Sequence, residues 1–359
     1  MTIFDLINDV INNAASDLHL VAGAPAAMRI NGELIFSEQP KLTPDDTKNF
    51  SYALLSEERR HKFEKDKELD FSYSYLNEEK NLFCRFRVNL YIQRGSVALA
   101  LRFIANEILT FADLKLPFIL KDIARLRRGL ILITGATGSG KSTTLAAIVD
   151  LINKERSCHI ITLEDPIEYF HSHKKSLVSQ REIGEDTSSF TWALREAVRQ
   201  DPDVILVGEM RDLETISIAI TAAETGHLVL ATLHTTDAVQ AIDRIIDVFP
   251  PHQQQQVRTQ ISITLQAVVA QQLAMHSDGK SRVPVVEIMI VNPAIRNLIR
   301  EGKTYQIYSV IETGKEQGMQ TLDQALQELI ARKQIKQSDA FQITRDPDNL
   351  RKKIEEFGA

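Results

Sequence analysis

The segment LILITGATGSGKST, residues 130–143, decides the fold of this chain. Four apolar residues lead into a G-x-x-x-x-G-K-[ST] motif, and residues 142–152 continue with helical spacing. In this order of strand, glycine-rich loop and helix, backbone N–H groups and a helix N-terminus can surround phosphate oxygens. The segment therefore predicts an α/β nucleotide-binding domain.

The loop contains the residues expected to bind ATP. Lys141 is expected to reach the β- and γ-phosphates, and the Ser142 hydroxyl is expected to ligate Mg²⁺. The glycines allow backbone N–H groups to turn inward around phosphate oxygens. The predicted ATP-binding residues are Gly135, Ala136, Thr137, Gly138, Ser139, Gly140, Lys141, Ser142 and Thr143.

Three more apolar runs follow, at residues 160–163, 204–207 and 228–233, with helical segments between them. This alternation is typical of a parallel sheet covered on both faces. Residues 259–277 lack Asp, Glu, Lys and Arg, but four glutamines make them too polar for a membrane span. Their apolar spacing predicts a soluble amphipathic helix.

At 359 residues, the chain is long enough for two domains. Residues 1–108 are predicted to form a small α+β unit, and residues 109–128, which include Pro117, are predicted to form a linker. The nucleotide-binding domain with a helical C-terminal region is then expected over residues 129–359.

Arginines mark a hairpin in the first domain. Residues 83–103 alternate apolar and polar side chains on both sides of Arg94-Gly95, which predicts two strands and a turn. Arg85 and Arg102, with Arg87 and Arg94, are either an ordinary solvated face or fingers onto the phosphates of a neighbouring subunit. The sequence leaves both interpretations open.

Two acidic residues follow apolar runs of the second domain. Ligands of parallel α/β sheets bind at the carboxyl ends of the strands, where Glu164 and Glu209 are expected. Glu209 is predicted to orient the attacking water, and Glu164 to complete the shell of Mg²⁺ and water. The alternative for either residue is a surface position at a strand end.

Two histidines, His227 and His234, stand at the ends of the run 228–233. A structural role and a catalytic role both remain open for each of them. No third residue at a suggestive spacing favours a metal site.

The composition excludes some classes of function. The chain has 42 Lys and Arg against 48 Asp and Glu, so phosphate-backbone binding is not expected and nucleic acid is not a predicted partner. Two cysteines, Cys84 and Cys158, are too few for a four-cysteine zinc module and suggest reduced thiols in a cytoplasm. The acidic residues near the start argue against an export signal.

Several motifs together resemble the secretion ATPases of type II secretion and type IV pilus systems. Besides the phosphate loop, residues 161–169 (ITLEDPIEY) resemble the family's Asp box, and residues 203–215 its Walker B segment with Glu209 in the catalytic place. His227 and His234 lie in a segment similar to its His box. Residues 294–301 (AIRNLIRE) resemble the signature of the retraction branch, whereas Ala136 stands where proline is usual.

The resemblance implies a PAS-like first domain, a RecA-like ATPase core and a homohexamer with ATP between subunits. In that arrangement Arg85 and Arg102 would reach a neighbouring site. It also implies ATP-powered pilus retraction and twitching motility, with the ring docked on an inner-membrane platform protein (PilC-like) at the cytoplasmic face. The ring is expected to be peripheral to the membrane and not inserted.

Other functions remain as alternatives. Within the family, one alternative is the accessory retraction paralogue. The other is a pilus assembly or type II secretion ATPase, and ATPases of that kind usually carry a four-cysteine zinc module, for which this sequence has too few cysteines. Outside the family the alternatives are a DNA-acting RecA-like translocase, which the charge balance disfavours, and a nucleotide-controlled scaffold that does not hydrolyse ATP.

Overall fold

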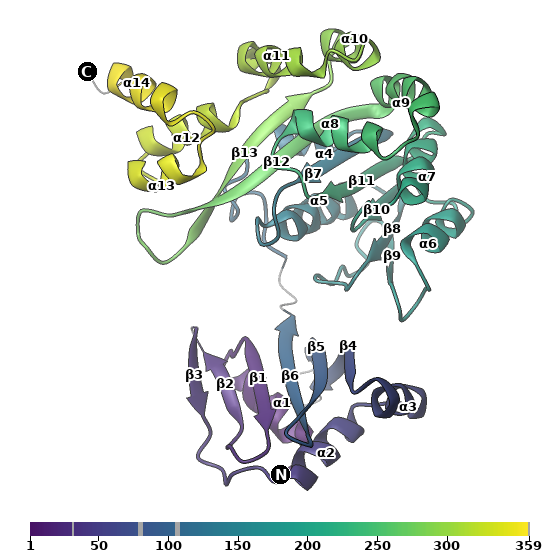
Figure 1. Cartoon of the computed structure of the whole chain (residues 1–359), viewed down its shortest axis with the longest axis vertical. Helices are drawn as coiled ribbons and strands as arrows, with labels where there is room; N and C mark the ends of the chain where they lie inside the picture. Colours follow the sequence, from purple (N-terminus) through teal and green to yellow (C-terminus); the bar gives the residue numbers. More distant parts are fainter. Residues whose placement is uncertain (31, 78–81, 105–107, 358–359) are drawn as a thin grey trace. The chain divides into compact units, whose positions relative to one another are not determined.

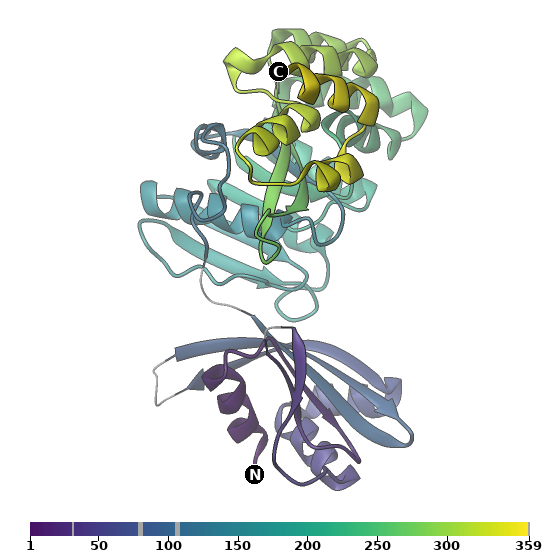
Figure 2. The ribbon, with the colours of Figure 1, turned by 90° about the vertical axis from the view of Figure 1, so that its left-hand side faces the viewer.

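The computed structural model describes residues 1–30, 32–77, 82–104 and 108–357. The chain forms two compact units, Met1–Glu107 and Ile108–Ala359, each with its own sheet (Figures 1 and 2). No helix within the described ranges is both long and apolar enough to cross a bilayer.

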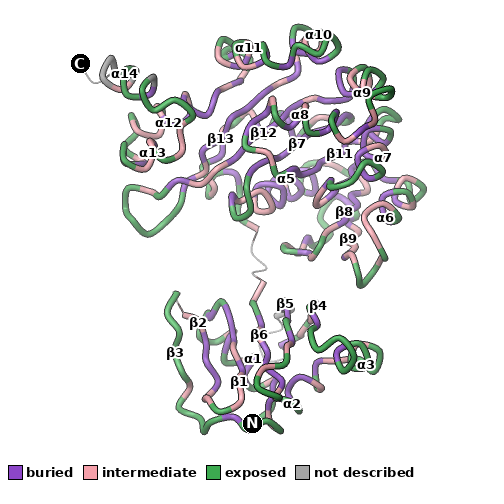
Figure 3. The backbone as a smooth tube through the Cα atoms, viewed as in Figure 1, coloured by how far each residue is buried: buried purple, intermediate pink, exposed green. Residues whose placement is uncertain are grey.

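Over its described residues, the first unit is an antiparallel sheet with three helices. Its strand order is β3-β2-β1-β6-β5-β4. The strands are β1 (Asp17–Val21), β2 (Ala27–Ile30), β3 (Glu33–Phe36), β4 (Glu68–Asn77), β5 (Leu82–Gln93) and β6 (Ser96–Ile104). The helices are α1 (Ile3–Asn12), α2 (Pro44–Ala53) and α3 (Glu57–Asp66). Apolar residues of α1, α2, α3 and the sheet make up its core, and Figure 3 shows the buried stretches of the backbone.

The predicted arginine hairpin is confirmed as β5 and β6. Phe86 and Val88 are fully buried, and the alternate residues Arg85 and Arg87 lie on the opposite face of the sheet. Arg87 is directly opposite Arg102 on β6, so the two side chains share that face. The hairpin therefore has one core face and one arginine-bearing face.

The second unit has a seven-stranded sheet of order β13-β12-β7-β11-β10-β8-β9. Its strands are β7 (Gly129–Thr134), β8 (His159–Glu164), β9 (Leu177–Glu182), β10 (Val204–Val207), β11 (Leu228–Leu233), β12 (Leu265–Met275) and β13 (Arg282–Ile290). All neighbouring pairs are parallel except β12 with β13. The four apolar runs predicted as parallel strands are confirmed as β7, β8, β10 and β11.

Helices cover both faces of this sheet, as predicted. One apolar core contains residues of α6 (Phe190–Ala197), α7 (Leu213–Glu224), α8 (Ala238–Asp247) and α9 (Pro251–Thr264). A second core, on the other side, contains residues of α4 (Ile119–Ala124) and α5 (Lys141–Glu155). The chain continues after β13 with α10 (Pro293–Arg300), α11 (Ile307–Thr313), α12 (Leu322–Ala331), α13 (Gln337–Ile343) and α14 (Pro347–Phe357).

The prediction of one amphipathic helix over residues 259–277 is wrong. The helix α9 ends at Thr264, and β12 begins at the next residue. Because β12 lies between β7 and β13, residues 267–270 are all fully buried. A strand buried on both faces has no alternation of polar and apolar residues, and its apolar positions can imitate helical spacing.

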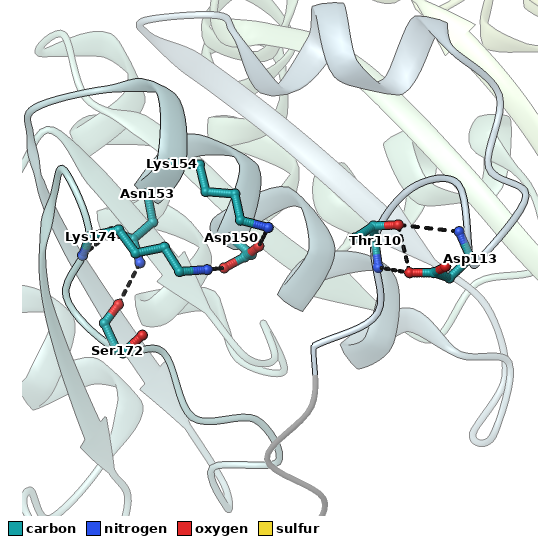
Figure 4. A network of polar contacts seen from close by, with 7 residues as sticks. All are labelled: Thr110, Asp113, Asp150, Asn153, Lys154, Ser172 and Lys174. Atoms are coloured by element: carbon teal, nitrogen blue, oxygen red, sulfur yellow. Dashed lines mark hydrogen bonds and ion pairs between the residues drawn. The ribbon is translucent and has the colours of Figure 1, made fainter.

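Residues 109–128 pack into the second unit. Leu116, Leu120 and Ile123 are buried in the core that α4 and α5 share. Near the start of this segment the hydroxyl and backbone N–H of Thr110 donate to the Asp113 carboxylate (Figure 4). The segment expected as a linker therefore contributes to the nucleotide-binding unit.

Candidate active site

Four chain segments meet at one edge of the second sheet. The strands β7, β11, β10 and β8 are parallel neighbours, so their carboxyl ends lie together. The phosphate loop, His234 and Glu209 follow β7, β11 and β10, and Glu164 is the last residue of β8. Ligands of such sheets bind at this edge. The structure thus gathers most of the predicted site residues in one place.

The phosphate loop requires glycine at its first position. Gly135 has φ of 146°, and a Cβ there would lie 2.3 Å from the backbone oxygen of Gln271. Gly140, with φ of 85°, leads into the first turn of α5. The loop is therefore shaped by its own backbone and by the neighbouring strand β12.

Lys141 folds back over the loop. Its Nζ donates to the carbonyl oxygens of Gly135 at 2.8 Å and Ala136 at 3.0 Å. Burial lowers the pKa of Lys141, and the charges of Glu209 and Glu168 oppose that effect. The ammonium group is thus placed among acceptors that phosphate oxygens would replace.

The first turn of α5 carries the other predicted ligands. Ser142 and Thr143 are half-buried, and the Thr143 hydroxyl lies 2.8 Å from the Tyr169 hydroxyl. Over the described ranges, no group of three or more His, Cys, Asp and Glu side chains is arranged to hold a metal ion. Ser142 and Glu164 are oxygen donors of the kind that Mg²⁺ prefers.

Glu164 is a half-buried carboxyl in contact with two neutral donors. Its Oε1 accepts from the Thr162 hydroxyl at 2.6 Å and from the Gln180 amide at 3.2 Å. Burial raises the pKa of Glu164 to about 7, although these hydrogen bonds act to lower it. The charge of Glu168 adds to the rise. Near neutral pH this carboxyl can take up or release a proton.

Glu209 lies between two basic side chains. Its carboxylate accepts from Arg211 Nη2 at 2.6 Å and lies 3.1 Å from His234 Nε2. Burial alone would raise the pKa of Glu209, but the Arg211 guanidinium and His234 outweigh it and hold that pKa below its usual value. Glu209 is therefore an ionised acceptor. Arg211 belongs to the Walker B segment, yet the sequence reasoning gave it no role.

The structure does not bring His227 to this edge within one chain. It immediately precedes β11, whose six residues separate it from His234 by roughly 20 Å of extended chain. Its Nδ1 lies 2.9 Å from the Ala222 carbonyl oxygen and 3.2 Å from the Thr225 hydroxyl. Of the two histidines, only His234 contacts a predicted catalytic residue of its own chain.

Arg85 and Arg102 belong to the first unit. Arg102 Nε donates to Asp17 Oδ1 at 2.9 Å, while most of the Arg102 side chain is exposed. Burial would raise the pKa of Asp17, but the hydrogen bonds from Arg102 and Ser16 hold it below its usual value. Arg85 lies on the same face of the sheet as Arg102 and is half-buried.

Polar contacts attach the loop after β8 to α5 (Figure 4). The buried Asn153 donates to the Ser172 carbonyl oxygen at 2.7 Å and accepts from the Lys174 backbone N–H at 3.1 Å. Asp150, one turn earlier, forms ion pairs with Lys154 and Lys174. These contacts fix the segment that follows Glu164 against the helix that begins at the phosphate loop.

Gln271 is a second residue that the sequence reasoning missed. It is 2% exposed on β12, and its amide contacts both Ser139 and Thr144. No local pattern distinguishes it, because the contact joins residues 132 positions apart. The strand order alone brings β12 beside β7.

Comparisons with known proteins match this chain along nearly its whole length. The family model described as Type II/IV secretion system protein matches residues 2–357. The chain is 46% identical to the type IV pilus retraction ATPase PilT of Pseudomonas aeruginosa, over 98% of this chain and 100% of that protein. It is 42% identical to the type IV pilus ATPase PilU of the same organism, over 96% of this chain and 89% of PilU. A crystal structure of the pilus retraction motor PilT with bound ADP superposes with a TM-score of 0.91 and 49% identity, covering 98% of this chain and 99% of that one.

Proposed function

This chain belongs to the Type II/IV secretion system protein family, and we propose that it is an ATPase that powers the retraction of a type IV pilus. The observation that carries the proposal is the similarity to an ADP-bound retraction motor along nearly the whole length of both chains. The geometry of the phosphate loop and of Glu209 supports the same activity.

The phosphate loop binds the nucleotide. Lys141 exchanges the carbonyls of Gly135 and Ala136 for β- and γ-phosphate oxygens, and the N-terminus of α5 faces the same charge. Glu209 accepts a hydrogen bond from the attacking water and orients it, while His234 and Arg211 hold the carboxylate in place. The contacts that hold the Glu209 carboxylate are therefore already formed before the nucleotide binds.

Magnesium fits the donors at this edge. Ser142 and Glu164 would hold the ion, and Mg²⁺ would neutralise charge that develops on the phosphates. Glu164 must lose its proton to serve as a ligand, and its pKa of about 7 allows this near neutral pH.

The active protein is proposed to be a homohexamer in which each subunit has a PAS-like domain and a RecA-like domain. Arg85 and Arg102 would act on the ATP of a neighbouring subunit, where a guanidinium can stabilise the charge of the transition state. For this Arg102 must leave Asp17, and its exposed position supports such a change. His227, remote from its own chain's phosphate loop, stays a predicted catalytic residue.

The motor is proposed to act at the cytoplasmic face of the inner membrane, on a PilC-like platform protein, and to produce twitching motility. The helix α10, which carries the AIRNLIRE segment, supports a coupling surface because Asn297 and Arg300 are exposed on it. The accessory role of a PilU-like protein is the alternative within the family.

Lys141→Ala is the test of this function. Hydrolysis of ATP and pilus retraction should both be lost, because the phosphate charge loses its partner. Lys336→Ala is the control, since Lys336 is exposed at the N-cap of α13 and makes no side-chain cap hydrogen bond. Phosphate release by the purified protein and pilus retraction in cells carrying each variant are the measurements.

Two outcomes would contradict the proposal. Normal phosphate release from Lys141→Ala would remove the phosphate loop from the mechanism. Absence of retraction in a cell that carries this chain as its sole family member would contradict a primary motor and favour the accessory role, because an accessory protein would not retract pili alone.

A further inference from the structure

A buried glutamine joins the phosphate loop to its helix. The Nε2 of Gln271 donates to the Ser139 carbonyl oxygen at 2.8 Å, and its Oε1 accepts from the Thr144 hydroxyl at 2.8 Å. Gln271 and Thr144 are each 2% exposed. Both ends of one amide are therefore used, one on the loop and one on the first turn of α5.

The contact at Ser139 determines which way a loop peptide faces. A phosphate loop binds anions through backbone N–H groups, so its carbonyl oxygens must point away from the phosphates. The amide of Gln271 is the donor that the structure gives to the Ser139 carbonyl. A buried carbonyl that loses its donor is strongly disfavoured, and it would turn toward another cation or N–H group. Lys141, which already contacts two loop carbonyls, is a cation within the same loop.

The backbone contacts between β12 and the loop are equally close. A Cβ on Gly135 would lie 2.3 Å from the Gln271 backbone oxygen, and a Cβ on Gly140 would lie 2.8 Å from Gln271 Nε2. Two glycines of the motif thus accommodate Gln271 as well as the nucleotide. The loop is packed against this residue at its beginning and at its end.

We propose that Gln271 is a positioning residue for ATP hydrolysis. Its amide turns the Ser139 carbonyl away from the nucleotide and attaches the loop to Thr144, so that Lys141 and Ser142 meet the phosphates in register. It touches neither the nucleotide nor the attacking water. The inference rests on the proposed ATPase function and assigns a further residue to that site.

The variants separate the two hydrogen bonds. Gln271→Met removes both of them with little change in side-chain volume. Thr144→Val removes the bond to Oε1, and Thr144→Ser keeps the hydroxyl. Gln272→Met is the matched control, since Gln272 is the next residue of β12, points to the other face and is half-buried.

The measurements are kcat and KM for ATP, the affinity for a fluorescent ADP, and the melting temperature without nucleotide, all on the full-length protein. Gln271→Met should lower kcat/KM by about 10- to 100-fold and weaken ADP binding, because a small misplacement of binding groups has effects of that order. Thr144→Val should show part of this loss, and Thr144→Ser and Gln272→Met should behave as wild type. The loss of kcat/KM in the double variant Gln271→Met/Thr144→Val should be less than the sum of the two single losses, because both substitutions remove the same hydrogen bond between Thr144 and Gln271.

Wild-type kcat, KM and ADP affinity in a folded Gln271→Met protein would overturn the inference. If that variant does not fold, wild-type kinetics in Thr144→Val would overturn it instead. A purely structural role would lower the melting temperature and leave kcat per folded subunit unchanged, which would also reject positioning. If the wild-type chain hydrolysed no ATP, the proposed function would fail, and the ADP affinities of the variants would still decide the role of Gln271.

Discussion

The carboxyl of Glu164 should make the stability of the nucleotide-free protein depend on pH. Burial raises its pKa from an ordinary 4.5 to about 7 in the folded chain. Between these values the folded chain binds more protons than the unfolded chain, so the free energy of unfolding falls as pH rises. The full difference corresponds to about 3 kcal/mol, lost from about pH 4.5 upward and complete above about pH 7.

Glu164→Gln removes this titration and keeps an oxygen that can accept from Thr162 and Gln180. The advantage of the variant over wild type should therefore grow by about 2.5 kcal/mol as pH rises from 5 to 8. For a domain of this size that is a relative gain of roughly 5–10 °C in melting temperature. Melting curves of both proteins across this pH range, without nucleotide or divalent cations, measure it. The contributions of other titrating groups to stability are common to both proteins and cancel in the difference between wild type and Glu164→Gln at each pH.

Thr162→Val is a second check, because it should strengthen the pH dependence that Glu164→Gln removes. The Thr162 hydroxyl bond acts to lower the pKa of Glu164, so its removal should shift the wild-type decline in stability to higher pH. A gap between wild type and Glu164→Gln that does not change with pH would refute the reasoning. So would a larger advantage for the variant at pH 5 than at pH 8, because the carboxyl would then be stabilised in its ionised form.

Three more predictions follow from contacts of named side chains. Glu209→Gln should keep ATP affinity and lower phosphate release by about 10²- to 10⁴-fold; equal turnover would exclude Glu209 as the group that orients water. Arg102→Ala should hydrolyse slowly, and mixing it with Lys141→Ala subunits should restore part of the activity, whereas no recovery in exchanging subunits would contradict action between subunits. Arg300→Ala should leave the melting temperature unchanged and stop pilus retraction, while Arg296→Ala should also destabilise the protein by about 1–3 kcal/mol; retraction at normal speed by Arg300→Ala would reject the coupling role.

The central part of the fold was predictable because it depends on local patterns. Each of the four apolar runs is short, lies between helical segments and forms a parallel strand. Because parallel strands end at the same edge, the positions of Glu164 and Glu209 beside the phosphate loop followed from the sequence alone. Periodicity failed for β12, which is buried on both faces, and β9 was missed because its sequence LVSQRE has only two apolar residues.

The side-chain partners of the site were less predictable, because they come from distant parts of the chain. Nothing near Glu209 in the sequence indicates that His234, from the loop after another strand, would lie 3.1 Å away. The case of His227 differs, since a strand of six residues between two histidines already places them at opposite edges of a sheet. The pKa of Glu164 depends on burial, which no local pattern gives.

The helix α10 shows how one segment can serve both fold and function. Arg296, on the same helix as the exposed Arg300, donates through Nη1 to the carbonyl oxygens of Ser262 and Ile263 at 2.9 and 2.8 Å. These carbonyls belong to the last turn of α9, where a helix leaves its acceptors without internal partners, so Arg296 caps that helix. The capped turn leads directly into β12, the strand that holds Gln271 against the phosphate loop. Exposed Arg300 is free of this task, which is why the two arginines of one helix should differ in their effects on stability and on retraction.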